Sequence, residues 1–204
     1  MSEALIITAL HDRQAPANLA ISMTEIVDRG MIDLRGLPKD KKFLSAAKSA
    51  LGVALPTEPC TSTQTGETLC FWMSVDQWLI VCPRKETGAL LGKLNGALEG
   101  IFSLAVDMSD ARSIIRLKGE RVRETLMKGS SIDFTQPGFE PGTVRRMLFG
   151  EIAAMVHVVS EAPEVFDLMV FRSYAHHAWD WLEATATKGS EVGFLKPAEA
   201  PAVV

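Results

Sequence analysis

The sequence predicts an α+β fold built from two pseudo-repeated β-α-β-β-α units with antiparallel or mixed sheets. An extended segment followed by an amphipathic helix occurs twice, at residues 32–52 and 114–129, and each time two apolar strands and a second helix follow. The strand segments 69–73 and 78–82 are apolar at almost every position, which indicates a sheet covered on both faces. We therefore expect a helix layer on one face, and the second unit or another chain on the other.

The first unit begins with the extended stretch I-D-L-R-G at residues 32–36. In the segment that follows, Leu44, Ala47 and Leu51 recur at the spacing of one helical face. Gly52 supplies a C-terminal stop, because glycine readily adopts the left-handed conformation that ends many helices. These residues predict an amphipathic helix.

The remainder of the first unit contains two strands, a helix and a further strand. The strands are predicted at residues 68–75 and 78–83, with only two residues between them, the length of a tight hairpin turn. A helix is predicted at residues 87–99. A strand at residues 101–107 then leads into the second unit.

The second unit repeats this order. It opens with I-I-R-L-K-G at residues 114–119, and the following helix turns Val122 and Leu126 inward. Two strands are predicted at residues 146–159 and 165–171. The segment H-H-A-W-D-W-L closes the unit as a helix.

The predicted organisation has four parts. Residues 1–27 form an N-terminal arm, because they show little periodicity. The two units occupy residues 28–106 and 107–187. Residues 188–204 form a C-terminal tail, where two closely spaced prolines prevent a regular element.

The composition is that of a soluble cytoplasmic protein. With 47% hydrophobic residues, 23% charged residues and a net charge of −4, it predicts neither a nucleic-acid nor a membrane partner. The N-terminus carries an acid before a short apolar run, so it does not resemble a signal peptide. Cys60, Cys70 and Cys82 are odd in number, lack C-x-x-C spacing and lie in or beside apolar runs, which favours reduced core thiols.

The segment R-S-Y-A-H-H-A-W-D-W-L at residues 172–182 raises the question of a metal or catalytic site. On a helix, one stripe consists of Ala175, Ala178, Trp179 and Leu182. Tyr174, His177 and Trp181 form another stripe that is predicted to face outward, with a composition favoured at protein interfaces. Because adjacent helical histidines diverge by about 100° and no third ligand lies nearby, we predict packing and an interface rather than a metal site.

No catalytic motif stands out. The chain has no G-x-S-x-G elbow and no glycine-rich phosphate loop. Basic residues gather between Arg112 and Arg146, which indicates either a solvated surface or a patch complementary to an acidic partner. We predict no catalytic, cofactor-binding or metal-ligating residue in this chain. The candidate subunit-interface residues are Tyr174, His177, Trp181, Arg145 and Arg146.

Several motifs resemble a known family. D-M-S-D-A-R-S-I-I-R-L-K-G-E-R-V at residues 107–122 resembles the D-x-S-x-x-x-x-I-x-V-x-G motif of the glycine-cleavage T-protein family, which has a folate-binding fold. Within that family, F-D-L-M-V-F-R-S-Y-A-H-H-A-W-D-W-L, P-G-T-V-R-R-M-L-F and S-V-D-Q-W-L-I-V are similar to the gamma subunits of heterotetrameric sarcosine oxidases. The resemblance covers roughly residues 30–186 and implies the fold of the first two T-protein domains.

The departures from the folate-using branch concern its chemistry. In that branch one strand begins with an acidic pair whose aspartate assists one-carbon transfer, whereas Ala153 and Ala154 stand at the matching positions here. Alanine cannot take or give a proton, so general acid–base catalysis at that place is excluded. The third, β-barrel domain of the T-protein is also missing.

The resemblance implies a structural subunit of a complex that demethylates sarcosine to glycine. It implies hydrogen peroxide as one product, and formaldehyde or 5,10-methylenetetrahydrofolate as the other. FAD, FMN, NAD, tetrahydrofolate and zinc are then expected in other chains of the complex, with none in this one. The implied partners are the alpha, beta and delta subunits, mainly alpha.

Three alternatives remain open from the sequence. The chain could be a freestanding folate-dependent aminomethyltransferase, although its alanine pair argues against this. It could be a regulatory or assembly factor that binds other proteins transiently. It could also be the gamma subunit of a related complex that oxidises another N-methyl amino acid, since substrate choice lies in a different chain.

Overall fold

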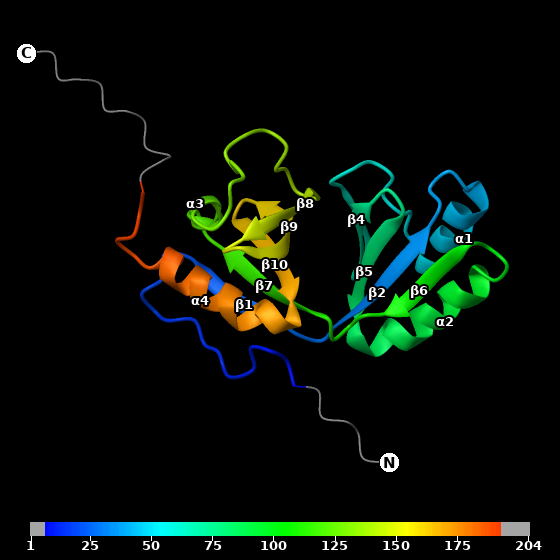
Figure 1. The fold of residues 1–204 in the computed structure, drawn as a ribbon, viewed down its shortest axis with the longest axis horizontal. Helices are drawn as coiled ribbons and strands as arrows, with labels where there is room; N and C mark the ends of the chain where they lie inside the picture. Colours follow the sequence, from blue (N-terminus) through cyan, green and yellow to red (C-terminus); the bar gives the residue numbers. More distant parts are fainter. Residues whose placement is uncertain (1–6, 193–204) are drawn as a thin grey trace, which may run out of the picture.

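Two five-stranded antiparallel sheets pack face to face, and helices cover their outer faces (Figure 1). The structure is a computed structural model that describes residues 7–192. Residues 193–204 of the predicted tail therefore lie outside the described residues. Among residues 7–192, no helix is long and apolar enough to cross a membrane. The α+β class predicted from the sequence is confirmed.

The first sheet has the strand order β3-β4-β5-β2-β6. In that order its strands are β3 (Ser62–Thr65), β4 (Thr68–Ser74), β5 (Gln77–Pro83), β2 (Arg29–Gly36) and β6 (Ser103–Asp107). Helices α1 (Lys41–Leu51) and α2 (Thr87–Ala97) pack on its outer face around Trp78 and Ile80. The polar strand β3 was not predicted, because S-T-Q-T lacks the apolar alternation that marks a strand.

Helix α1 shows how local sequence sets its ends. The Asp40 side chain accepts hydrogen bonds from the backbone N–H groups of Lys42 and Phe43, which satisfies donors that have no partner within the helix. Gly52 ends the helix at a φ of 71°, as predicted. The fully buried apolar residue of the first turn is Phe43 rather than Leu44.

The second sheet has the strand order β1-β7-β10-β9-β8. In that order its strands are β1 (Ser22–Ile26), β7 (Arg112–Lys118), β10 (Glu164–Phe171), β9 (Ile152–Glu161) and β8 (Val144–Phe149). Its helices are α3 (Val122–Met127) and α4 (Ala175–Ala186). The second sheet matches the first when β2 is set against β7, β5 against β10, β4 against β9 and β3 against β8.

The fifth strand of each sheet comes from a different part of the chain. In the first sheet β6 follows α2, whereas in the second sheet the same position is filled by β1 from the N-terminal segment (Figure 1). Met23 of β1 is only 4% exposed and belongs to the core beneath α4. Residues 22–26 are therefore a strand of the second sheet, although the sequence predicted an arm over residues 1–27.

The single strand predicted at residues 146–159 is a hairpin. Strands β8 and β9 are separated by Gly150 and Glu151, whose φ values are 53° and 70°. Two consecutive residues with positive φ make the turn whose twist suits a two-residue hairpin. A glutamate in this conformation is uncommon, so the dipeptide gave little sign of the turn.

The two sheets share a core of their own. Met31, Phe71, Met73, Leu79 and Val81 of the first sheet meet Ile114, Val144, Met155 and Met169 of the second. Strands β4 and β5 of the first sheet are apolar on both faces because helices cover one face and the second sheet covers the other. Their composition therefore requires no covering chain.

Candidate functional site

Helix α4 carries the histidine–tryptophan segment, and its inner stripe is buried. The helix follows a short 3₁₀ turn, Arg172–Tyr174, at the end of β10. Its buried residues include the whole predicted stripe, Ala175, Ala178, Trp179 and Leu182. These side chains pack into the core of the second sheet. The tryptophan and alanines of this stripe are packing residues.

The other stripe of α4 does not face outward along its whole length. Tyr174 is 44% exposed and His177 is exposed, but Trp181 is half-buried against Phe149, with ring centroids 6.5 Å apart. The β8–β9 turn reaches this side of the helix, and Gly150 O lies 2.8 Å from His177 Nε2. The prediction that Trp181 points outward is therefore wrong, because a turn distant in sequence covers it.

Arg145 and Arg146 lie in β8 and, as neighbours in a strand, project to opposite faces of the sheet. The Arg145 guanidinium contacts Cys60 Sγ at 2.9 Å and lies over the Phe139 ring. The exposed Arg146 donates from Nη1 to Met73 O at 3.3 Å, on the side facing the first sheet. The structure does not bring these two arginines into one patch, and their interface role stays a prediction.

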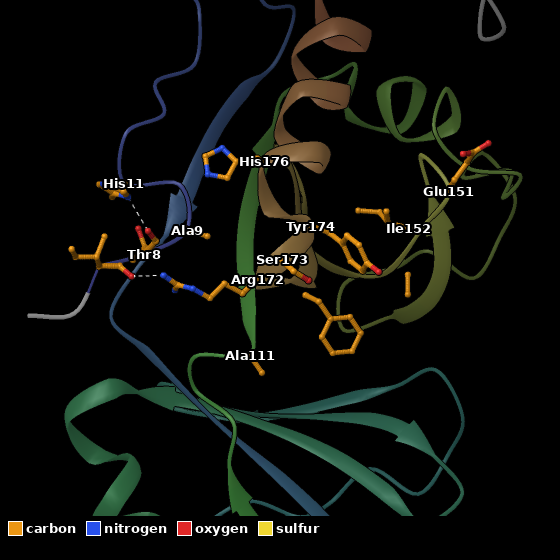
Figure 2. Close-up of a pocket in the computed structure, with 13 residues that line it drawn as sticks. Thr8, Ala9, His11, Ala111, Glu151, Ile152, Arg172, Ser173, Tyr174 and His176 are labelled. Atoms are coloured by element: carbon orange, nitrogen blue, oxygen red, sulfur yellow. Dashed lines mark hydrogen bonds between the residues drawn. The ribbon is translucent and has the colours of Figure 1, made fainter.

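A cavity of about 1000 Å³ lies beside the start of α4 (Figure 2). One wall is the N-terminal segment, which is held by a hydrogen bond from Arg172 Nη2 to Ile7 O at 2.7 Å. The other wall includes the β8–β9 turn and the start of β9. Figure 2 shows Arg172, Ser173 and Tyr174 between these walls. This cavity was not predictable from the sequence, because its walls come from segments far apart in the chain.

One residue of the alanine pair lines this cavity. Ala153 lines it, whereas the next residue in β9, Ala154, points the other way into the core and is buried. A folate site that moves protons needs an acid or base facing the cavity, and alanine supplies neither. Glu151 also borders the cavity but is exposed in the turn. The residues present therefore do not fit a folate-dependent one-carbon transfer site.

A serine, a histidine and an aspartate lie close together in the space between the two sheets. Ser62 Oγ lies 3.5 Å from His157 Nε2, and His157 pairs across the strands with Asp167. However, Ser62 donates its proton to Gly142 O at 2.7 Å, and Asp167 accepts two 2.8 Å hydrogen bonds from Arg116. A catalytic triad needs these groups bonded to the histidine instead. The arrangement is therefore a structural polar cluster.

Burial makes His157 a neutral side chain. Desolvation lowers the pKa of its imidazole to about 4, with Asp167 acting in the opposite direction. Its Nδ1 is buried, with no hydrogen-bond partner among the described residues. Its edge meets the Phe71 ring, with centroids 4.9 Å apart. This strand histidine is a packing residue.

The cysteines and acidic groups form no further site in the part of the chain that the structure describes. Cys70 and Cys82 are buried, and burial raises the pKa of the Cys70 thiol to about 12. Cys60 is half-buried and, like the other two, forms no disulfide. Within residues 7–192, no group of three or more His, Cys, Asp or Glu side chains could hold a metal ion.

Most of the basic residues between Arg112 and Arg146 have internal partners. Arg116 pairs with Asp167, and Arg123 Nε lies 2.5 Å from Glu164 Oε1. Arg121 pairs with Glu124, and Lys128 Nζ donates to two backbone carbonyls. The cluster is therefore neither a solvated helix face throughout nor a single basic patch. Arg112 and Arg146 face the space between the two sheets and, among the described residues, form no ion pair with a carboxylate.

Comparisons with known proteins agree on one family. A model of the sarcosine oxidase, gamma subunit family matches residues 35–188. The curated sarcosine oxidase subunit gamma of Arthrobacter sp. is 28% identical over 121 residues, which span 59% of this chain and 58% of the relative. The protein of the same name from Corynebacterium sp. strain U-96 is 23% identical over 85% of this chain and 83% of its own length.

Solved structures confirm the fold. The heterotetrameric sarcosine oxidase of Corynebacterium sp. U-96, in complex with pyrrole 2-carboxylate, contains a chain that superposes with a TM-score of 0.82 at 20% identity, covering 92% of this chain and 98% of that one. The glycine cleavage system aminomethyltransferase T of Bartonella henselae superposes with a TM-score of 0.60 at 13% identity, covering 85% of this chain and 47% of that one. The T-protein-like fold expected from the sequence is thus present.

Proposed function

This chain belongs to the sarcosine oxidase, gamma subunit family, and we propose that it is the non-catalytic gamma subunit of a heterotetrameric sarcosine oxidase. The complex would demethylate sarcosine oxidatively to glycine, with hydrogen peroxide and either formaldehyde or 5,10-methylenetetrahydrofolate as the other products. The family match over residues 35–188 carries this proposal. The 0.82 superposition on a chain of a heterotetrameric sarcosine oxidase supports it.

The chemistry would belong to other chains. Ala153 stands in the cavity wall at a position where the resemblance to the folate-using branch implies an acid, and Ser62, His157 and Asp167 are not bonded as a triad. Both observations support a subunit without catalytic residues. FAD, FMN, NAD, tetrahydrofolate and zinc would be held elsewhere in the complex.

The proposed partners are the alpha, beta and delta subunits, with alpha as the main one. Of the five residues that the sequence offers as an interface, Tyr174, His177 and Arg146 are exposed and therefore available to a partner. Trp181 and Arg145 are half-buried, so they would pack beneath the exposed interface residues rather than contact the partner over their whole side chains. Tyrosine and arginine are enriched at such interfaces.

Co-purification tests this proposal. A tag on this chain, expressed in its native host, should recover three other subunits at one copy each, together with the absorbance spectrum of bound flavin. The recovered complex should oxidise sarcosine faster than other N-methyl amino acids, such as N-methylglutamate. Recovery of the chain without flavin-containing partners would contradict the proposal, as would a clear preference for a different N-methyl substrate.

A titration of the isolated chain with tetrahydrofolate distinguishes the proposed structural subunit from the alternative, a freestanding folate-dependent aminomethyltransferase. The alanine at position 153 predicts no aminomethyl transfer and no tight folate binding. If the isolated chain binds tetrahydrofolate tightly or oxidises sarcosine alone, the proposed non-catalytic role is wrong.

A further inference from the structure

At one end of the space between the two sheets, the first sheet exposes apolar residues. In β6, Leu104 pairs with Arg35 and Val106 with Asp33, so these side chains share the face that carries Met31 in the inter-sheet core. Leu104 is 50% exposed and Val106 is 39% exposed. The second sheet therefore leaves this edge of the facing surface uncovered.

The second sheet contributes exposed apolar residues to the same end. Phe171 follows Met169 by two residues in β10, and Leu148 follows Val144 by four residues in β8, so both share the inter-sheet face. Phe171 is 38% exposed and Leu148 is 65% exposed. The inter-sheet faces of both sheets thus carry exposed apolar side chains.

Two arginines lie between these apolar residues. Arg112 precedes Ile114 of the inter-sheet core by two residues, and its guanidinium stacks 4.3 Å from the centroid of the Phe171 ring. Arg146 reaches from β8 to Met73 O of the first sheet. Among the residues that the structure describes, neither guanidinium forms an ion pair with a carboxylate.

The two positive charges interact unfavourably with each other. Burial and the charge of Arg146 lower the pKa of Arg112, and Asp33 only partly offsets them. The Asp33 carboxylate already accepts a 2.6 Å hydrogen bond from Gln77 Nε2 and lies 3.5 Å from Arg35 Nε. An additional carboxylate brought to this place would relieve the repulsion and pair with both guanidinium groups.

We propose that these residues form an inter-sheet docking surface for another subunit, and that the segment seated there carries apolar side chains and at least one carboxylate held by Arg112 and Arg146. The surface consists of Leu104, Val106, Arg112, Arg146, Leu148 and Phe171. The inference rests on the proposed function, since it needs partner subunits. Among residues 7–192, strand β6 has β2 as its one strand neighbour, so its other backbone edge is open to a strand from the partner.

The combination of features favours a partner subunit over other occupants. A small anion would satisfy the arginines but leave apolar residues of both sheets exposed. A second copy docking through this same surface would place four arginines together around a two-fold axis, which charge repulsion opposes. A different protein segment with apolar and acidic side chains satisfies both the charges and the apolar area.

The docking surface is tested by measuring how much of each substituted chain is recovered in the complex. A tagged flavin-containing subunit is co-expressed with the Arg112→Glu/Arg146→Glu double variant, or with Leu104→Asp. We expect each to be recovered in the complex at a level at least about tenfold lower than the unsubstituted chain. The matched controls are Lys118→Glu, an exposed charge in β7, and Val27→Asp, an exposed apolar residue outside the surface; both should be recovered within about twofold of the unsubstituted chain.

Amide hydrogen exchange on the unsubstituted protein gives a result that does not depend on variant folding. Exchange over residues 103–107 should be at least about tenfold slower in the complex than in the isolated chain. Equal exchange there, or recovery of the variants at the level of the controls, overturns the docking surface. If the unsubstituted chain does not co-purify with flavin-containing subunits, it is the proposed function that fails.

A final measurement separates a small ligand from a protein partner. Succinate serves as a free dicarboxylate, and the melting temperature of the isolated chain is followed as its concentration rises. If succinate stabilises the chain, Arg112→Glu abolishes that effect, and the same variant is fully retained in the complex, then the site binds a small anion and the docking surface is wrong.

Discussion

At the scale of single residues, the buried His157 couples folding to pH. Its pKa is about 4 in the folded chain and about 6.5 when unfolded, so the folded state favours the neutral imidazole. Stability is fully present above pH 6.5 and falls as the pH drops toward 4, because the unfolded chain binds a proton that the folded chain excludes. The loss is about 3 kcal/mol, at 1.36 kcal/mol per pKa unit.

We predict that His157→Phe removes this part of the pH dependence. Urea unfolding at pH 7 and pH 4.5 would measure the free energy of unfolding of both proteins. The unsubstituted chain should lose about 2–3 kcal/mol more than the variant between the two pH values. Equal losses would show that His157 is not the group responsible.

Gly150 supports a second residue-scale prediction. A Cβ at this position would lie 2.9 Å from two ring carbons of Trp181, and the backbone has a φ of 53°. Gly66 offers a matched control, because its φ is 57° but no atom lies within 4 Å of the added Cβ. We expect Gly150→Ala to lower the free energy of unfolding by about 1–3 kcal/mol more than Gly66→Ala, as measured by urea titration. Similar costs would mean that the α4 contact does not constrain this turn.

The burial of a side chain was predictable from the sequence where it depends on the spacing of residues within one helix or strand. It was not predictable where a segment distant in the chain covers the side chain. The buried stripe of α4 follows from helical spacing alone. Trp181 was predicted outward because its covering group, the β8–β9 turn, is about thirty residues away in the chain. Arg112 stood out in the sequence only as one end of a basic cluster, because its significance depends on Arg146 and Phe171 from two other strands.

At the scale of secondary-structure elements, β1 is where expectation and structure differ most. The segment S-M-T-E-I is short and only partly apolar, so it lacks a strong strand pattern. Its pairing partner β7 begins almost ninety residues later. Long apolar strands and capped helices were predictable because they carry local signals; β1, β3 and the β8–β9 turn depend on distant pairing.

We predict that β1 is required for stability. Met23→Ala removes a buried side chain from the core beneath α4 and should lower the free energy of unfolding by about 2–5 kcal/mol. Thr24→Ala on the opposite, exposed face of the same strand should change it by less than about 0.5 kcal/mol. Equal effects of the two substitutions in chemical denaturation would show that the segment is only an arm.

At the scale of the whole molecule, the inter-sheet core ties the two sheets together. The two-unit architecture was predictable from the repeated order of elements, and so was the need to cover both faces of the first sheet. The sequence left open whether the second unit or another chain supplied the cover. That choice depends on how the units face each other, and no local pattern specifies it.

We predict that the two sheets unfold together. Phe71→Ala, in the inter-sheet core, should lower the free energy of unfolding by about 3–5 kcal/mol and speed amide exchange in β5 and β10 alike. Phe102→Ala, at an 84% exposed position, is the matched control and should cost less than about 0.5 kcal/mol. Faster exchange in β5 alone would show that the sheets unfold independently.

The origin of β1 has a consequence for how the protein is made. The entire first sheet, from β2 to β6, is inserted between β1 and the rest of the second sheet. On the ribosome, β1 emerges early but cannot pair until β7 and β10 have left the exit tunnel, whereas the first sheet is complete by residue 107. The nascent chain must therefore carry an unpaired strand through most of its translation, and a slow stage of synthesis after residue 107 would lengthen the time during which that strand can pair wrongly.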